Sequence, residues 1–446
     1  MAETGSTIFE PRIPGPGRRI RWRGLFGSGL GLAVASLAKR GVPLIVATAD
    51  MRSASRLETQ LRFFLDTAGI TLQPFPDWEC LPYDNFSPHP DLVSQRLLTL
   101  HRLPAMRSGV VVLPVSNLMQ RLPPVEYVHS HTFDLKVGDT VDAGELAGRL
   151  QKAAYHNVSQ VLSPGEFSIR GGVIDVFPMG SQQPFRIDLF GDRIESIRHF
   201  DPDSQRSVDR VEVLRLLPAT EFPLDDDAVR GFRQRFRSSF EGDPQKSSIY
   251  RDVSRGITPA GIEFYFPLFF EHTATIFDYL PEETVVVHDD TLEQACESNH
   301  AAVLDRHELA VTAGENPVMP PRSLYLSPDE VAGAIGRFPR IETTVYSDGD
   351  GESLGTSAPP GFTAPTHSQE PFEPLATFLS GYPGRVLLIA ESPGRREILR
   401  GVLRDRGFSA TELDGWAAFL EGETRLGITV DRLEDGLMLQ EPALAV

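Results

Sequence analysis

The sequence has 446 residues, of which 41% are hydrophobic and 23% charged, a composition typical of a folded protein with at least three domains. Its 43 basic and 61 acidic side chains leave a net charge of −18, which argues against a DNA-binding surface over the whole chain. No stretch approaches the ~20 consecutive apolar residues that span a bilayer, and the N-terminus lacks the apolar core of a secretory signal. We therefore expect a cytoplasmic protein without membrane contact.

The cysteines and histidines do not support a metal site or a disulfide framework. Cys80 and Cys296 lie far apart and have no partner at the spacing of zinc ligands. Histidines such as His89, His101 and His156 are too scattered for a metal site or a catalytic triad. We expect structural roles for these side chains and no metal.

The first part of the chain has the pattern of a nucleotide-binding type of domain. A tail rich in Pro, Gly and Arg covers residues 1–19. Over residues 20–131, buried strands such as Leu44–Ala47 and Val110–Leu113 alternate with amphipathic helices such as Ala49–Thr67. This alternation predicts a parallel α/β sheet.

The middle of the chain changes pattern twice. Residues 132–217 contain short alternating strands separated by Gly turns, which predict a β-rich module, either inserted or separate. Residues 218–345 return to helices and one buried strand, Thr284–His288. We expect this second stretch to complete the first α/β domain.

The last hundred residues predict a linker and a small domain. Residues 346–371 are rich in Ser, Gly, Pro, Thr and Asp, which predicts a flexible linker. The strand Arg385–Ala390 and the helix Glu397–Arg406 predict a small α/β domain over residues 372–446. The final residues, Ala443–Val446, are apolar, whereas termini are usually solvated, so we expect the chain to be part of a longer protein and this domain to be incomplete.

A glycine-rich segment near the N-terminus is the first candidate site. Gly24 and Gly29 have the spacing of the phosphate loop G-x-x-x-x-G-K-[ST], whose backbone N–H groups cradle phosphates while its Lys and hydroxyl bind phosphate and Mg²⁺. Leu30 and Gly31 stand where that loop needs the Lys and the Ser or Thr. We therefore expect no ATP hydrolysis, although a helix N-terminus can still bind an anion. The alternative is a glycine-rich turn that never bound a ligand.

Two carboxylates follow the predicted strand Thr284–His288 and are the second candidate. An ATPase places an Asp at such a strand end to hold Mg²⁺, with a neighbouring acid as base, so Asp289 and Asp290 could be remnants of this arrangement. Read alone, two solvated acids at a strand end are the simpler explanation. No residue of the chain is predicted to be catalytic.

The third candidate lies in the β-rich module, where residues 185–190 alternate apolar and polar side chains. With a period of two, Arg186, Asp188 and Phe190 share one face of the strand, and the residues between them face the core. Arg170 ends an upstream strand of a predicted hairpin near the same sheet, so it joins Arg186 and Phe190 in a surface with the composition of interface hot spots. The alternative is an ion pair of Arg186 with Asp188 or another nearby acid, beside a half-buried Phe190.

Three longer motifs add a resemblance to a known family. Residues 75–89 read FPDWECLPYDNFSPH, residues 165–178 read GEFSIRGGVIDVFP, and residues 186–190 read RIDLF. Together and in this order they resemble the bacterial transcription-repair coupling factor (Mfd) family, over nearly the whole chain. The resemblance implies a fold similar to the excinuclease subunit UvrB: a degenerate RecA- or helicase-like parallel-sheet domain, interrupted by a β-rich module and followed by a small α/β domain.

The resemblance also implies a function. UvrB has an intact phosphate loop, so the departures at Leu30 and Gly31 and at Asp289–Asp290 imply a decayed ATP site. In the family, the β-rich module resembles the part of UvrB that binds UvrA, and the matching positions here are Arg170, Arg186 and Phe190. The chain would then be a non-catalytic adaptor that recruits UvrA and needs no cofactor.

Other activities of the family are implied for regions that this chain does not contain. They are RNA-polymerase binding, DNA translocation driven by ATP and Mg²⁺, and a C-terminal regulatory domain that covers the UvrA-binding face in the resting protein. A UvrB-type ATP-dependent subunit that processes damaged DNA is an alternative, but the DNA-wedging hairpin of UvrB has no aromatic counterpart between Leu72 and Thr99. A DNA-binding architectural protein is disfavoured by the net charge of −18.

Overall fold

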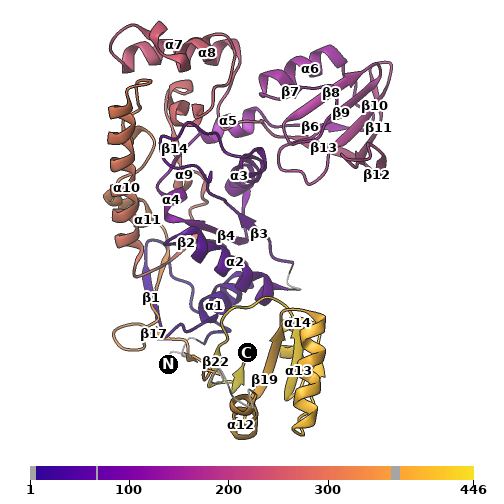
Figure 1. The fold of residues 1–446 in the computed structure, drawn as a ribbon, viewed down its shortest axis with the longest axis vertical. Helices are drawn as coiled ribbons and strands as arrows, with labels where there is room; N and C mark the ends of the chain where they lie inside the picture. Colours follow the sequence, from indigo (N-terminus) through magenta and orange to yellow (C-terminus); the bar gives the residue numbers. More distant parts are fainter. Residues whose placement is uncertain (1–6, 67–68, 363–371) are drawn as a thin grey trace.

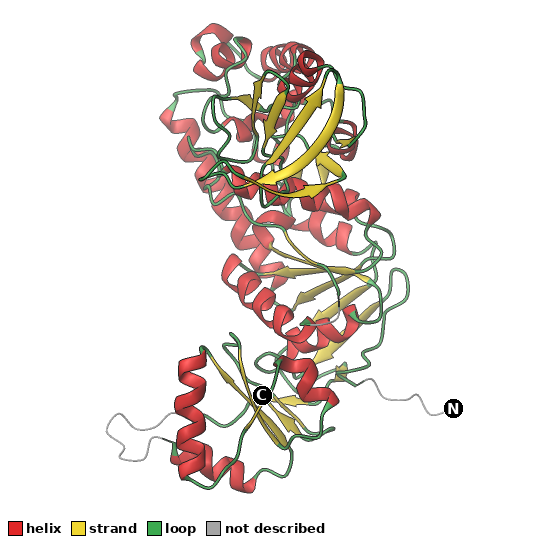
Figure 2. Ribbon diagram, turned by 90° about the vertical axis from the view of Figure 1, so that its right-hand side faces the viewer, coloured by secondary structure: helices red, strands yellow, loops and turns green. Residues whose placement is uncertain are grey.

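The computed structural model describes residues 7–66, 69–362 and 372–446. The molecule is elongated: a central parallel sheet lies between a small α/β domain at one end and a β-rich module with a helical lobe at the other (Figure 1). Figure 2, turned by 90°, shows helices on both sides of the central sheet. The predicted α/β class, with a β-rich insertion and a further small domain, is confirmed.

The central domain is built on seven parallel strands in the order β17-β1-β16-β15-β2-β4-β3. Their bounds are β1 (Arg19–Arg23), β2 (Pro43–Thr48), β3 (Leu72–Pro74), β4 (Gly109–Pro114), β15 (Val285–Asp289), β16 (Arg340–Thr343) and β17 (Glu352–Ser353). Every residue of β2 and β4 is buried, and both are rich in aliphatic side chains, as parallel strands covered on two faces require. The predicted strands in this region are therefore present.

Helices cover both faces of the central sheet. Alternate residues of β2, such as Leu44 and Ile45, face opposite sides, so α1 and α2 pack on one face and α3, α10 and α11 on the other. The bounds are α1 (Gly29–Ala38), α2 (Met51–Leu65), α3 (Pro90–Arg102), α10 (Leu292–Ala313) and α11 (Pro328–Ile335). The predicted helix Ala49–Thr67 is α2, although its last residue lies outside the described residues. It begins after Asp50, whose carboxylate accepts a hydrogen bond from the Ser53 N–H at 2.7 Å.

A helical lobe and several short elements surround the sheet. They are η1 (Leu103–Ala105), α4 (Val115–Leu118), β5 (Arg121–Leu122), α5 (Val125–Ser130), α7 (Asp226–Ser239), η2 (Pro244–Lys246), α8 (Ser248–Ser254), η3 (Ile262–Phe269), β14 (Ala274–Thr275), α9 (Ile276–Tyr279) and η4 (Pro321–Ser323). The motif at residues 75–89 is anchored near the lobe. Phe75 and Trp78 lie against the guanidinium of Arg96, which is buried and pairs with Glu221 at 2.6 Å. A buried, paired arginine gives this motif a structural role.

The β-rich module enters the chain between β4 and β15 of the central sheet, so it is an insertion. Its six-stranded sheet has the order β12-β11-β10-β9-β8-β7. The bounds are β7 (His156–Asn157), β8 (Glu166–Arg170), β9 (Val173–Val176), β10 (Phe185–Phe190), β11 (Arg193–Phe200) and β12 (Ser207–Val211). One face packs against α6 (Ala143–Lys152) and the two-stranded sheet β6 (Phe133–Lys136) with β13 (Val213–Leu216), and this leaves the other face for polar side chains.

The small α/β domain has its own six-stranded sheet in the order β18-β22-β23-β19-β21-β20. The bounds are β18 (Thr356–Ser357), α12 (Glu373–Gly381), β19 (Arg385–Ala390), α13 (Pro393–Asp405), β20 (Thr411–Glu412), α14 (Gly415–Glu421), β21 (Leu426–Val430), β22 (Met438–Leu439) and β23 (Leu444–Ala445). The predicted strand Arg385–Ala390 has the same bounds as β19. The predicted helix begins four residues earlier than expected, because the Ser392 side chain caps it and proline suits its first turn.

The structure differs from the predicted tail and linker. In the tail, Ile8 is 1% exposed and packs in the core of the central domain, while residues 1–6 lie outside the described residues. The predicted flexible linker, residues 346–371, contains β17 and β18, each paired in a different sheet. Only Leu354 and Gly355 separate these two strands, and residues 363–371 are not described. Composition did not predict β17 and β18, because two-residue strands form through partners that are distant in sequence.

Candidate functional site

The glycine-rich segment has the strand–loop–helix arrangement of a phosphate loop. It connects β1 to α1, and Gly24 and Gly27 have positive φ angles of 66° and 54°. Leu30 lines a cavity of about 310 Å³ at the carboxyl edge of the central sheet, together with Asp289 and Asp290. The structure thus brings together the first and second candidates, as expected for ligand sites of open α/β sheets.

The loop at this cavity has Leu30 and Gly31 where a working phosphate loop has its Lys and its Ser or Thr. A methyl group added at Gly31 would lie 2.5 Å from Cβ of Gln60, so the hydroxyl residue of a working phosphate loop would require α2 to shift. The Asp289 carboxylate accepts hydrogen bonds from the backbone N–H and the hydroxyl of Thr291, at 3.0 and 2.7 Å. The arginine in the cavity wall, Arg56, pairs with an aspartate of the small α/β domain. The loop thus has the strand–loop–helix position of a phosphate loop without its Lys, and the arginine of the cavity wall is engaged in an ion pair.

The third candidate centres on a carboxylate that was not predicted from the sequence, Asp175 of β9. It is 1% exposed and lies directly opposite Arg186 of β10 in the antiparallel register. Arg186 donates from Nε to Asp175 Oδ1 at 2.7 Å and from Nη2 to Oδ2 at 3.0 Å, and Arg170 donates to the same carboxylate. The hydrogen bonds that Arg186 donates to Asp175 raise the pKa of Arg186. One buried acid therefore holds both predicted arginines on the polar face of the sheet.

The two arginines differ in exposure. The guanidinium of Arg186 also donates to the Gln205 carbonyl oxygen at 3.1 Å and lies 4.8 Å from the ring centre of Phe200, so only 20% of its side chain is exposed. Within the described residues, the Arg170 side chain donates a hydrogen bond to Asp175 and to no other group, and it is 53% exposed. Arg170 can thus reach a partner directly, whereas Arg186 mainly supports the sheet.

Phe190 lies at the open end of the same face. Its side chain is 81% exposed, the highest fraction among the exposed large hydrophobic side chains of the described residues. A register shift between Asp188 and Leu189 interrupts the pairing of β10 with β11, and Phe190 is the last residue of its strand. An apolar ring in this position is available to a partner.

The structure corrects the predicted exposure of Arg186. Arg186 was expected to face solvent, but it is largely covered; the alternative of an ion pair with a nearby acid describes it better, with Asp175 rather than Asp188 as the partner. Phe190 is largely exposed rather than half-buried. The alternation in residues 173–176 could have indicated Asp175, because a Gly-Gly hairpin places it on the polar face beside Arg186.

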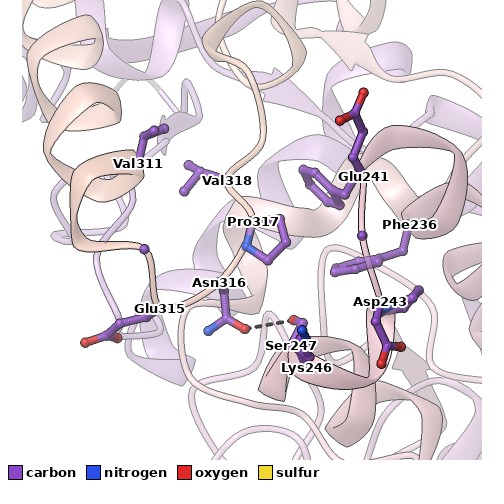
Figure 3. A pocket seen from close by; sticks show the side chains of 14 residues that line it. Phe236, Glu241, Asp243, Lys246, Ser247, Val311, Glu315, Asn316, Pro317 and Val318 are labelled. Atoms are coloured by element: carbon purple, nitrogen blue, oxygen red, sulfur yellow. Dashed lines mark hydrogen bonds between the residues drawn. The ribbon is translucent and has the colours of Figure 1, made fainter.

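A pocket between the end of α10 and the loop after α7 has Asn316 in its wall. The side-chain oxygen of Asn316 accepts a hydrogen bond from the Ser247 hydroxyl (Figure 3) and another from the Ser248 N–H. Within the described ranges there is no group of three or more His, Cys, Asp or Glu side chains that could hold a metal ion. Cys80 and Cys296 are both free thiols, and burial raises the pKa of Cys296 to about 11. Nor does any helix in these ranges have the length and apolar character needed to cross a membrane.

Two domain-family models match the chain, one in the β-rich module and one in the small α/β domain. Residues 133–222 match the model of the UvrB interaction domain family, and residues 378–446 match the model described as MFD, D3 domain. The first match contains Arg170, Arg186 and Phe190. The second covers most of the small α/β domain.

Curated relatives cover nearly the whole chain. It is 39% identical to the transcription-repair-coupling factor of Escherichia coli (strain K12) over 384 residues, which is 85% of this chain and 33% of that protein. The protein of the same name from Haemophilus influenzae is 36% identical over 444 residues, 98% of this chain and 38% of the relative. The chain thus spans about a third of the length of these relatives. Two domain matches and these identities show that the chain is similar to transcription-repair-coupling factors over about a third of their length.

Proposed function

We propose that this chain is an adaptor that recruits UvrA, the partner of UvrB in nucleotide excision repair. The observation that carries the proposal is the exposed Phe190 on the same face of the sheet as the half-exposed Arg170, in a module that matches the UvrB interaction domain. An aromatic ring and an arginine are the side chains most enriched among interface hot spots. The adaptor role fits a family named for the coupling of transcription to repair.

The local chemistry suggests what the partner offers. Asp175 uses its carboxylate to orient Arg170, whose remaining N–H groups are free to pair with a carboxylate or carbonyl oxygen of UvrA. Phe190 would enter an apolar pocket and lose its exposed surface on binding. Recognition then combines a directional charged contact with apolar burial.

Titration calorimetry of the chain with purified UvrA tests this proposal directly. We expect saturable binding with a negative change in heat capacity, because apolar surface is buried in the complex. UvrB is a useful positive control, since it would engage the same partner. Absence of both heat and co-elution, under conditions in which UvrB binds, would reject the adaptor role.

The alternative is a UvrB-type subunit that processes damaged DNA with ATP. It would require DNA-stimulated ATP turnover by this chain, which phosphate release measures. Because Leu30 and Gly31 provide neither charge nor hydroxyl, we expect a rate equal to that of the protein-free reaction, with and without DNA. Turnover that rises in proportion to protein concentration and is stimulated by DNA would favour the alternative.

The remaining activities are proposed for the two thirds of the family proteins that this chain does not cover. They are contact with RNA polymerase, ATP- and Mg²⁺-driven movement on DNA, and an intramolecular contact through which a C-terminal domain covers the UvrA-binding face. On this proposal the chain itself needs no cofactor. It supplies the repair partner, and the other regions supply the polymerase contact and the motor.

A further inference from the structure

The glycine-rich loop is occupied by the chain itself. The hydroxyl of Thr356, the first residue of β18, accepts a hydrogen bond from the Phe26 N–H at 2.9 Å and donates one to the Gly24 carbonyl oxygen. Thr356 is 8% exposed and belongs to the edge strand of the small α/β domain. A backbone N–H of the loop, the type of donor that binds phosphate in a working site, thus bonds to a threonine hydroxyl.

Two glycines of the loop permit this close approach. A methyl group at Gly29 would lie 3.1 Å from the Thr356 hydroxyl oxygen, and one at Gly27 would lie 2.0 Å from the carbonyl oxygen of Gly436. The latter contact is with backbone, which cannot rotate away as a side chain can. The loop glycines therefore have a packing role here that does not involve a ligand.

The contact continues into a shared apolar core. Trp416 of α14 is fully buried, and its ring lies 5.1 Å from that of Phe64 and 6.0 Å from that of Phe63, both on α2. At the rim, Arg56 of α2 pairs with Asp435 of the small domain at 3.5 Å. Buried aromatic pairs of this kind stabilise domain contacts well beyond what one hydrogen bond contributes.

The short connection between the two sheets also favours a fixed position of the small α/β domain on the central domain. β17 pairs with β1 at the edge of the central sheet, and β18 pairs with β22 in the small domain. Only Leu354 and Gly355 lie between these strands, and Leu354 is 4% exposed. The two-residue connection between β17 and β18 therefore places Thr356 at the glycine-rich loop.

We infer that the loop Gly24–Gly29 serves as an internal docking site for the small α/β domain, and that Thr356 replaces the phosphate of a nucleotide there. This inference does not depend on UvrA recruitment. Its consequence is competition: a nucleotide phosphate could use the Phe26 N–H only after Thr356 has left. The loop has been converted from ligand binding to domain docking, which fixes the small domain on α1 and α2.

Hydrogen exchange of the full chain, with mass analysis, tests the steric part. In Gly27→Ala we expect exchange of α14 and residues 435–439 to rise by tenfold or more, because the new methyl group meets the Gly436 carbonyl. Gly41→Ala is the matched control: Gly41 also has a positive φ, 76°, but no atom lies within 4 Å of the added methyl group. Equal exchange in the two variants would overturn the docking role of the loop.

Thr356→Val keeps the side-chain volume and removes only the hydroxyl, so it serves even if Gly27→Ala folds poorly. We expect the Phe26 amide to exchange at least tenfold faster, while UvrA binding and exchange of the β-rich module stay unchanged. An unchanged Phe26 amide would overturn the inference. Adding millimolar Mg-ADP to the wild-type chain should change nothing, and protection of the loop by ADP with α14 still protected would contradict the competition.

Discussion

Replacing Phe190 by alanine is expected to weaken the binding of UvrA by tenfold or more and to leave the stability of the chain unchanged. Phe190 is 81% exposed, so it contributes little to folding, and most of its apolar surface is available to a partner. An aromatic anchor at an interface centre typically contributes about 2 kcal/mol or more, and about 1.4 kcal/mol corresponds to tenfold in affinity. Calorimetric titration and thermal unfolding of the same samples measure the two quantities.

Val208→Ala is a suitable control for this prediction. Val208 is 63% exposed and lies on the edge strand β12, which β11 separates from β10. Its replacement therefore also removes exposed apolar surface from the module. We expect UvrA affinity to change less than twofold. If both variants bind as the wild type does, Phe190 is not the anchor, although the titration of the unmodified chain would still report on the adaptor role.

Replacing Arg186 by alanine is expected to destabilise the β-rich module by about 2 kcal/mol or more. The change removes both hydrogen bonds to Asp175 and leaves a carboxylate that is 1% exposed with Arg170 as its remaining partner. A buried charge that loses its main partner costs far more than a surface pair contributes. The measurement is chemical unfolding followed by a probe within the module.

A surface pair of the same module provides the comparison. Arg215 bonds to Asp134 at 2.8 Å, but it is 56% exposed, so Arg215→Ala should cost less than about 1 kcal/mol. UvrA binding of Arg186→Ala should fall in step with its folded fraction. A loss of affinity at full stability would instead show that Arg186 contacts UvrA itself.

Periodicity was sufficient for much of the fold. The aliphatic runs that became β2 and β4 predicted buried strands of a parallel sheet, because strands covered on both faces are rich in such residues. The run Arg385–Ala390 was predicted as a strand and forms β19. Likewise, strict alternation placed Arg186 and Phe190 on the polar face of β10. These properties depend on neighbouring residues, so local sequence carries them.

The absence of phosphate-binding charge at Leu30 and Gly31, the core-facing pattern of the strands and the family motifs were determined by the sequence alone. Tertiary structure alone decided that Gln205 and Phe200 cover Arg186, and that Thr356 occupies the loop at Gly24 from more than 300 residues away. A sequence pattern reports which face a side chain takes. It does not report which distant group meets that face, because such pairing depends on strand register and on domain packing.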